Sequence, residues 1–113
     1  MFFSLNCLID GDDTDRMFTV EVPKNKNVSI LKGLIKEKNP SSLGNVDVRV
    51  VDLFQVSILL GAEPVDVNLD IDKKLKPPHK KLSFFFDQID DDHLHVIASV
   101  PGTSLLSFLR NVI

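Results

Sequence analysis

Two histidines and three aspartates late in the chain are the residues best suited to metal chemistry. Asp90, Asp91 and Asp92 directly precede the segment that holds His93 and His95. Residues two apart in a strand point to the same side, so the two imidazoles could converge on one metal ion. The spacing supplies no complete tetrahedral ligand set. We therefore favour the alternative, in which both histidines lie on the solvated face of the last strand.

A second acidic group partly matches a calcium-binding loop. Asp10, Asp12, Thr14 and Glu21 fall at ligand positions of such a loop, but Asp15 stands where the sharp turn needs glycine. The flanking segments also alternate like strands, whereas the calcium loop joins two helices. We predict no metal site and no cofactor.

Nucleophilic catalysis would require a serine or cysteine close to a histidine base. The single cysteine, Cys7, falls on the apolar face of the first predicted strand, as a small core residue does. The sequence also lacks a glycine-rich phosphate loop and a His-Glu-x-x-His pattern. We expect no enzymatic activity and no small-molecule substrate.

Two further clusters are candidates for binding. A candidate basic patch surrounds Pro77-Pro78 and consists of Lys73, Lys74, Lys76, Lys80 and Lys81. It could contact phosphate or direct nuclear import, although a solvated loop has the same composition without any function. The run Phe84–Phe86 cannot place all three rings in one core, so part of it is expected at the surface for a protein partner, with core or lid packing as the alternative.

Length and charge limit the remaining possibilities. The 113 residues are enough for one domain, and the net charge of −3, with both signs interspersed, gives no strong field for nucleic acid or an anionic membrane. No apolar run approaches the ~20 residues of a membrane span. The apolar start, Met1–Ile9, lacks a basic leader and runs directly into acidic residues, so no conventional signal peptide is visible.

The elements that would position these residues follow from periodicity. Residues 3–9 and 17–22 alternate in polarity around an acidic turn, which predicts a β-hairpin. A helix is predicted from Val28 to about Asn39, with Asn27 as its N-cap, an apolar face, and Pro40 as a stop. The residues of its apolar face are Val28, Leu31, Leu34 and Ile35.

The second half of the chain adds two strands. The segment 50–58 is rich in β-forming residues and predicts a central strand, and 94–100 predicts the last strand. We expect mostly irregular chain from 59 to 81, and a short helical turn or strand at 82–86. The order strand, turn, strand, helix predicts an α+β fold of the β-grasp (ubiquitin-like) type, with a mixed sheet of four to five strands packed on one helix.

Five segments, in order, resemble the N-terminal domain of fungal Crinkler effectors. They are Leu5–Gly11, Val28–Lys38, Asp52–Ile58, Lys80–Ser83 and His93–Ile97. The resemblance covers roughly residues 3 to 100. It implies a ubiquitin-like targeting module that takes part in the secretion or translocation of an effector into host cells, where the host nucleus is a frequent destination. A protein partner, in the host or in the secretion machinery, is implied as well.

The resemblance points to one segment as the translocation or recognition motif. Its residues are Leu53, Phe54, Gln55, Val56, Ser57 and Ile58. Oomycete relatives carry Leu-x-Leu-Phe-Leu-Ala-Lys here, and the Ala-Lys pair is absent from this chain, which argues against oomycete-style uptake. We expect the side chains that face away from the helix to be exposed for recognition.

The domain prediction assigns residues 1–100 to a ubiquitin-like Crinkler N-terminal domain. Residues 101–113 have helical spacing and are expected to form a C-terminal tail or the start of a missing effector domain. The alternative function is an intracellular ubiquitin-like adaptor whose sheet binds a partner protein, and a folded remnant without function is a third possibility. The chain ends without the Gly-Gly of a conjugated modifier.

Overall fold

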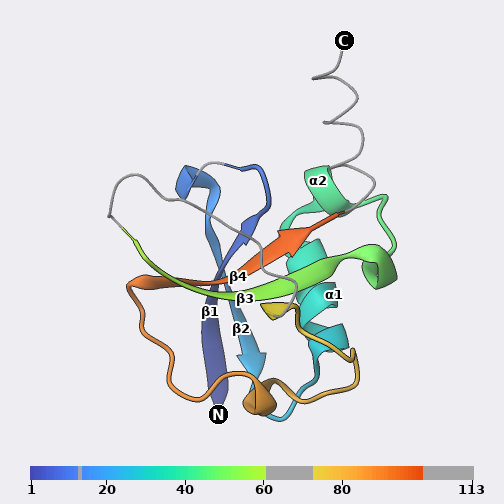
Figure 1. The fold of residues 1–113 in the computed structure, drawn as a ribbon. Helices are drawn as coiled ribbons and strands as arrows, with labels where there is room; N and C mark the ends of the chain where they lie inside the picture. Colours follow the sequence, from blue (N-terminus) through green and yellow to red (C-terminus); the bar gives the residue numbers. More distant parts are fainter. Residues whose placement is uncertain (13, 61–72, 101–113) are drawn as a thin grey trace.

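A four-stranded mixed sheet with one main helix across one face forms the described part of the chain (Figure 1). The computed structural model describes residues 1–12, 14–60 and 73–100. The strands are β1 (Phe2–Ile9), β2 (Phe18–Pro23), β3 (Asp52–Leu59) and β4 (His93–Ser99), and the sheet order is β2-β1-β4-β3. The predicted segment 101–113 and the section 61–72 of the irregular chain lie outside the described residues.

The N-terminal hairpin pairs β1 with β2 as predicted. The two strands are antiparallel, with Phe3 opposite Val22 and Leu5 opposite Val20. Gly11 lies in the turn with φ of 95°, a left-handed conformation that glycine adopts without steric cost. The alternation of polarity therefore sets the register, because a slip of one residue would turn every buried valine to the other face.

The last strand returns to the centre of the sheet. β4 runs parallel to β1, with Cys7 opposite Val96, and antiparallel to β3, with Phe54 opposite Ile97. The predicted last strand is confirmed, with a shift of one residue at each end. The predicted central strand at 50–58 is instead the edge strand β3. It begins later than predicted, because residues 48–50 form a 3-10 turn with the Asp47 side chain accepting from the Arg49 N–H.

Helix α1 (Val28–Lys38) begins where the sequence predicted. The Asn27 side-chain oxygen accepts the Ile30 N–H at 3.0 Å, which satisfies one of the free amides of the first turn. Val28, Leu31 and Ile35 are fully buried against the sheet. Lys32, which is not among the residues of the predicted apolar face, is also buried, with 7% of its surface exposed.

The segment after α1 forms a second, short helix, where the sequence analysis predicted only a stop at Pro40. Pro40–Leu43 form the single-turn helix α2, whose first position suits proline because no intrahelical N–H is needed there. Leu43 is buried beside α1 and anchors this turn to the core. The segment 82–86 contains a 3-10 turn at Leu82–Phe84, which resolves the two predicted alternatives in favour of helix.

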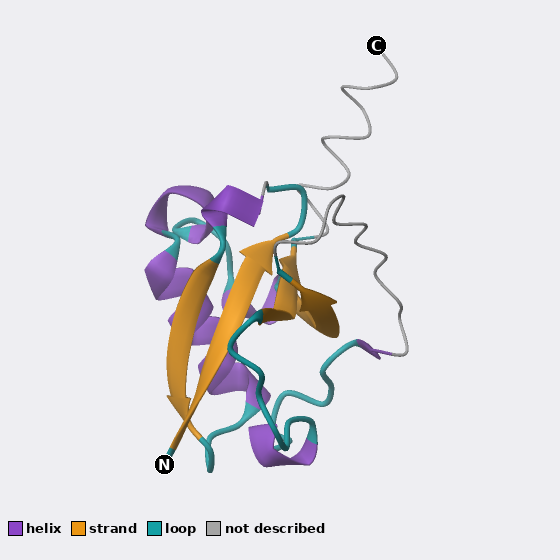
Figure 2. Cartoon of the chain, turned by 90° about the vertical axis from the view of Figure 1, so that its left-hand side faces the viewer, coloured by secondary structure: helices purple, strands orange, loops and turns teal. Residues whose placement is uncertain are grey.

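Two apolar clusters lie on opposite faces of the sheet, because their residues alternate along the strands. Figure 2 shows the strands with the main helix behind them. The larger lies under α1 and includes Leu5, Leu31 and Val96. The smaller lies on the other face and consists of Leu8, Phe54, Leu94 and Ile97, with Met17, Val56, Ile58 and Leu60 packed against it. The central strands therefore bury side chains on both faces, unlike a strand with one solvated face.

Gly33 is a weakness of α1 that a methyl group should correct. A Cβ added at Gly33 would meet no atom within 4 Å. Because glycine costs helices about 1 kcal/mol relative to alanine, Gly33→Ala should raise the free energy of unfolding by up to about 1 kcal/mol in chemical denaturation. Gly11→Ala is the matched control and should destabilise, since its φ is positive. Equal effects of the two substitutions would contradict this account.

Candidate functional site

The candidate recognition motif lies on β3, at the end of the sheet order. Its first two residues are core residues on opposite faces. Leu53 is fully buried in the cluster under α1, and Phe54 is 8% exposed in the opposite cluster. The expectation that side chains facing away from the helix are exposed is therefore wrong for Phe54.

The second half of the motif contains an irregularity in the β3–β4 ladder. Gln55 lies opposite Val96 and Ile58 opposite Leu94, so Val56 and Ser57 together oppose a single residue of β4. Such a bulge adds one residue to a strand and redirects the side chains on either side of it. Val56 and Ile58 are half-buried against the second cluster, whereas Ser57 is exposed.

Gln55 is held by the rest of the fold. Its Nε2 donates to the Phe85 carbonyl oxygen at 2.9 Å, which ties β3 to the segment after the 3-10 turn. Ser57 is therefore the one motif side chain, all six being described, that is mainly exposed to solvent. Most of the motif therefore has a structural role in the sheet, and the polar group that it exposes to solvent is the Ser57 hydroxyl at the bulge.

The candidate basic patch is anchored to α1 by its backbone. The Val28 N–H donates to the Lys80 carbonyl at 3.1 Å and the Ser29 N–H to the Pro78 carbonyl at 2.9 Å. These carbonyls satisfy amides at the start of the helix that have no intrahelical partner. The segment thus has a structural role that its lysine content did not indicate.

The five lysines have different environments. Lys73, Lys76 and Lys81 are exposed. Lys80 Nζ lies 4.2 Å from the centre of the Phe84 ring, and Lys74 Nζ lies 3.2 Å from Asp52 Oδ1. Two of the five charges are therefore engaged within the domain, and three remain for an external partner.

Asp52 connects this segment to the buried lysine of α1. Burial lowers the pKa of Lys32; the nearby Asp52 carboxylate opposes that shift, and the Lys74 charge adds to it. The three charges lie where α1, the start of β3 and the basic segment meet. Sequence periodicity missed this group because a lysine does not count toward an apolar face, so the burial of Lys32 left no signal in the pattern.

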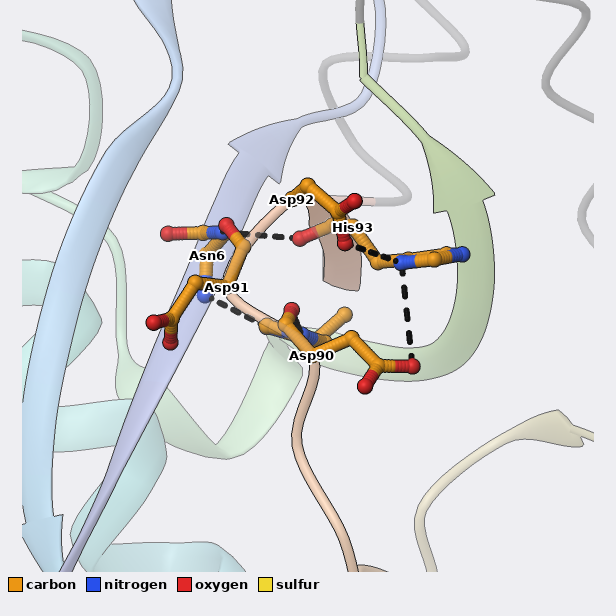
Figure 3. Close-up of polar contacts among 6 residues, drawn as sticks. Asn6, Asp90, Asp91, Asp92 and His93 are labelled. Atoms are coloured by element: carbon orange, nitrogen blue, oxygen red, sulfur yellow. Dashed lines mark hydrogen bonds and ion pairs between the residues drawn. The ribbon is translucent and has the colours of Figure 1, made fainter.

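The histidines of β4 belong to a polar network with β1 (Figure 3). The Asn6 N–H donates to His95 Nδ1 at 2.9 Å, and the Asn6 side-chain amide donates to the His93 carbonyl at 2.7 Å. Since His95 Nδ1 accepts a hydrogen bond from a backbone amide, Nε2 carries the ring hydrogen and donates to the Asp90 carbonyl at 2.7 Å. Thr19 Oγ1 donates to Asn6 Oδ1 and extends the network to β2.

This network corrects the expected position of the histidines. His95 is buried, with 5% of its surface exposed, and both of its ring nitrogens are engaged within the protein. His93 is half-buried, and its Nδ1 lies 2.9 Å from Asp92 and 3.8 Å from Asp90 (Figure 3). Within residues 1–12, 14–60 and 73–100, no group of three potential ligands could hold a metal ion.

The phenylalanine run divides between core and surface as its sequence indicated. Phe86 is buried, with its ring centre 6.0 Å from that of Phe3, and Phe84 is 67% exposed. Phe85 is half-buried and meets the Phe84 ring edge-on. Phe84 with Lys80 over its face is an exposed amphipathic feature beside the basic segment.

Comparison with known protein families identifies the family of this chain. Residues 3–99 match the profile described as "Crinkler effector protein N-terminal domain". The chain belongs to this family. A curated relative, "Crinkler effector protein 1" of Rhizophagus irregularis (strain DAOM 181602 / DAOM 197198 / MUCL 43194), is 28% identical over 109 residues. That match covers 95% of this chain and 23% of the relative, so the chain spans about a quarter of the relative's length.

The same fold occurs in the solved structure of a mouse protein domain. The C-terminal ubiquitin-like domain of mouse tubulin-specific chaperone e superposes with a TM-score of 0.54 at 13% identity. The match covers 88% of this Crinkler domain and 86% of the mouse domain. This likeness confirms the predicted ubiquitin-like fold. None of the described helices is long and apolar enough to cross a membrane.

His95 should contribute to stability through its two hydrogen bonds. Leucine can neither accept from the Asn6 N–H nor donate to the Asp90 carbonyl, so His95→Leu should cost about 1–3 kcal/mol of unfolding free energy. His79→Leu is the control, because His79 is exposed and its replacement should change stability by less than about 0.5 kcal/mol. Urea denaturation of both variants measures the difference in unfolding free energy. Equal losses would show that the two His95 hydrogen bonds do not contribute to stability.

Cys7 should be chemically inert while the domain is folded. Burial raises the pKa of its thiol to about 12, so the nucleophilic thiolate is nearly absent at pH 8. A thiol-reactive dye should label the native chain at pH 8 far more slowly than the chain in guanidinium chloride. The ratio of the two rates measures the protection, and comparable rates would place Cys7 at the surface.

Proposed function

We propose that this chain is a non-enzymatic targeting module of a Crinkler-type effector, which takes part in secretion or in translocation into host cells. The observation that carries the proposal is the family match over residues 3–99, which spans the whole described sheet and helix. Both the family domain and the ubiquitin-like fold are non-catalytic kinds of domain. The buried Cys7 and the fully bonded His95 offer no nucleophile with a free base.

The structure limits which side chains of the motif on β3 a delivery partner could contact. Five of its six side chains are buried or half-buried, and Ser57 extends from the bulge into solvent. A partner that recognises this strand would contact the bulge and the Ser57 hydroxyl. Leu53 and Phe54 would matter to delivery only through folding, because each belongs to an apolar cluster.

Secretion is tested with the full chain, tagged at its C-terminus and expressed in the producing organism. The tagged protein should appear in the culture filtrate and in host fractions while a cytosolic marker stays in the cells. Retention together with the marker would overturn the effector proposal and support the intracellular adaptor.

Recognition at the bulge is tested in the same assay with a matched pair of substitutions. Ser57→Arg places a long charged side chain at the bulge, and Ser42→Arg makes the same change on the exposed surface of α2. Both variants should unfold within about 0.5 kcal/mol of the original chain. Delivery of Ser57→Arg should fall several-fold while Ser42→Arg is delivered normally, and equal delivery of the two would remove the motif from the proposal.

A further inference from the structure

We propose that the open edge of β2, with the groove between β2 and α1, binds an extended peptide segment in which an apolar residue is flanked by lysine or arginine. β2 is the terminal strand of the sheet and pairs only with β1 in the described part of the chain. The Figure 1 view places it beside α1. The proposal goes beyond the delivery function and does not depend on it, since it concerns binding by the purified chain.

The hydrogen-bonding pattern identifies which backbone groups face outward. The Lys24 N–H donates to the Met1 carbonyl at 3.1 Å, which makes these two residues a hydrogen-bonded pair of the antiparallel ladder. Because such pairs alternate along two strands, Val22 and Val20 direct their backbone groups to β1. The N–H and C=O groups of Thr19 and Glu21 therefore point away from the sheet.

These four groups define a short docking edge. Within residues 1–12, 14–60 and 73–100, no backbone hydrogen bond outside the strand ladders involves Thr19 or Glu21. The edge ends at Pro23, which has no N–H and whose carbonyl accepts from Lys26. An exposed edge of this kind is a template for pairing with another strand, and a segment of about four residues is long enough to use it.

A groove runs along the same edge. Its volume is about 600 Å³, and it is lined by Thr19, Val20, Glu21, Leu34, Glu37 and Lys38. Leu34 is half-buried and supplies the apolar surface, while Glu21, Glu37 and Lys38 are exposed. In an added strand, successive side chains point to opposite faces, so a residue packed over Leu34 would have neighbours that point to the outer face of the sheet, opposite α1.

The charged residues along the groove indicate which kind of peptide would bind there. Glu21 lies between the buried Val20 and Val22 and therefore points to the outer face, where it favours basic residues on either side of the apolar one. Glu37 of α1 adds a second carboxylate at the groove, beside the single ammonium of Lys38. A second copy of this chain is a poorer fit, because it would bring its own Glu21 and Glu37 to the same acidic edge. The chain as a whole also carries a net charge of −3. We therefore assign the groove to a basic and apolar partner segment.

The edge strand is held in place by the core and by a side-chain hydrogen bond. Val20 and Val22 are buried under α1, with 1% and 0% of their surfaces exposed. Thr19 Oγ1 donates to Asn6 Oδ1 at 2.9 Å and joins the edge to the polar network of β1 and β4. A pre-organised edge lowers the conformational entropy that binding must remove.

The test uses the full chain and two capped pentapeptides, Lys-Val-Lys-Val-Lys and Glu-Val-Glu-Val-Glu. Binding is followed by backbone amide chemical shifts in NMR titrations. The basic peptide should shift the amides of residues 18–22 and 34–38, and it should slow hydrogen exchange at Thr19 and Glu21. The acidic peptide should bind at least about tenfold more weakly, since its three carboxylates approach an edge where two carboxylates outnumber one ammonium.

Two variants separate the backbone edge from the groove charge. Glu21→Pro removes an outward N–H without removing a bond to β1, and Glu21→Thr keeps that N–H as its control. Glu37→Lys reverses one groove charge on the exposed side of α1 without touching β2, so it remains informative if the proline variant does not fold. Glu21→Pro should abolish binding, whereas Glu21→Thr, which loses the same carboxylate but keeps the N–H, should weaken it only a few-fold. Glu37→Lys should weaken the basic peptide about three- to tenfold.

The outcomes are decisive in both directions. Shifts confined to β2 and the end of α1, with the stated responses of the variants, would support the proposal. Shifts on β3 instead, unchanged binding by Glu37→Lys, or no binding of the basic peptide would overturn it. Concentration-dependent dimerisation that Glu21→Pro prevents would also overturn it, because the edge would then serve a second copy of the chain.

Discussion

The parallel pairing of β1 with β4 is the interaction on which the rest of this Crinkler domain depends. It joins the two ends of the described chain at the centre of the sheet, where Cys7 lies opposite Val96. The hairpin, α1 and β3 are arranged around this pair. Because both strands bury residues on both faces, the pair belongs to two apolar clusters at once. Any change of register here would expose one cluster while inserting polar residues into the other.

Polar contacts complete this pairing where the ladder becomes irregular. The extra residue in β3 lies opposite His95, and the His95 ring accepts the Asn6 N–H that the parallel ladder leaves free at that point. The Asn6 side chain in turn holds the Asp91 and His93 carbonyls, so the turn before β4 is fixed to β1. Buried polar groups are costly unless they are bonded, and in the described residues every fully buried side-chain polar atom has a partner. The histidines and aspartates that suggested a metal site therefore help to fix the register of β4 against β1.

The surface that remains for partners is smaller than the motif on β3 implies. Most of that strand is committed to the two clusters, and the basic segment is committed in part to the start of α1. Among the features left accessible are Ser57 at the bulge, Phe84 with Lys80, the three exposed lysines of the basic segment and the open edge of β2. A small non-catalytic domain can thus combine a common architecture with separate recognition edges, because binding residues need only lie on a rigid scaffold.

Local patterns in the sequence determined the hairpin, the N-cap at Asn27, the apolar face of α1 and the last strand. Each of these depends on residues close in the chain, whose periodicity or capping chemistry is readable directly. Tertiary structure alone decided the burial of His95 and Lys32, the bond from Gln55 to Phe85 and the second cluster around Phe54. A partner such as Asn6 lies 89 residues from His95 in sequence, so no local pattern could reveal it. Burial on both faces of a strand likewise follows from which neighbours the fold supplies, and single-sequence alternation does not record those neighbours.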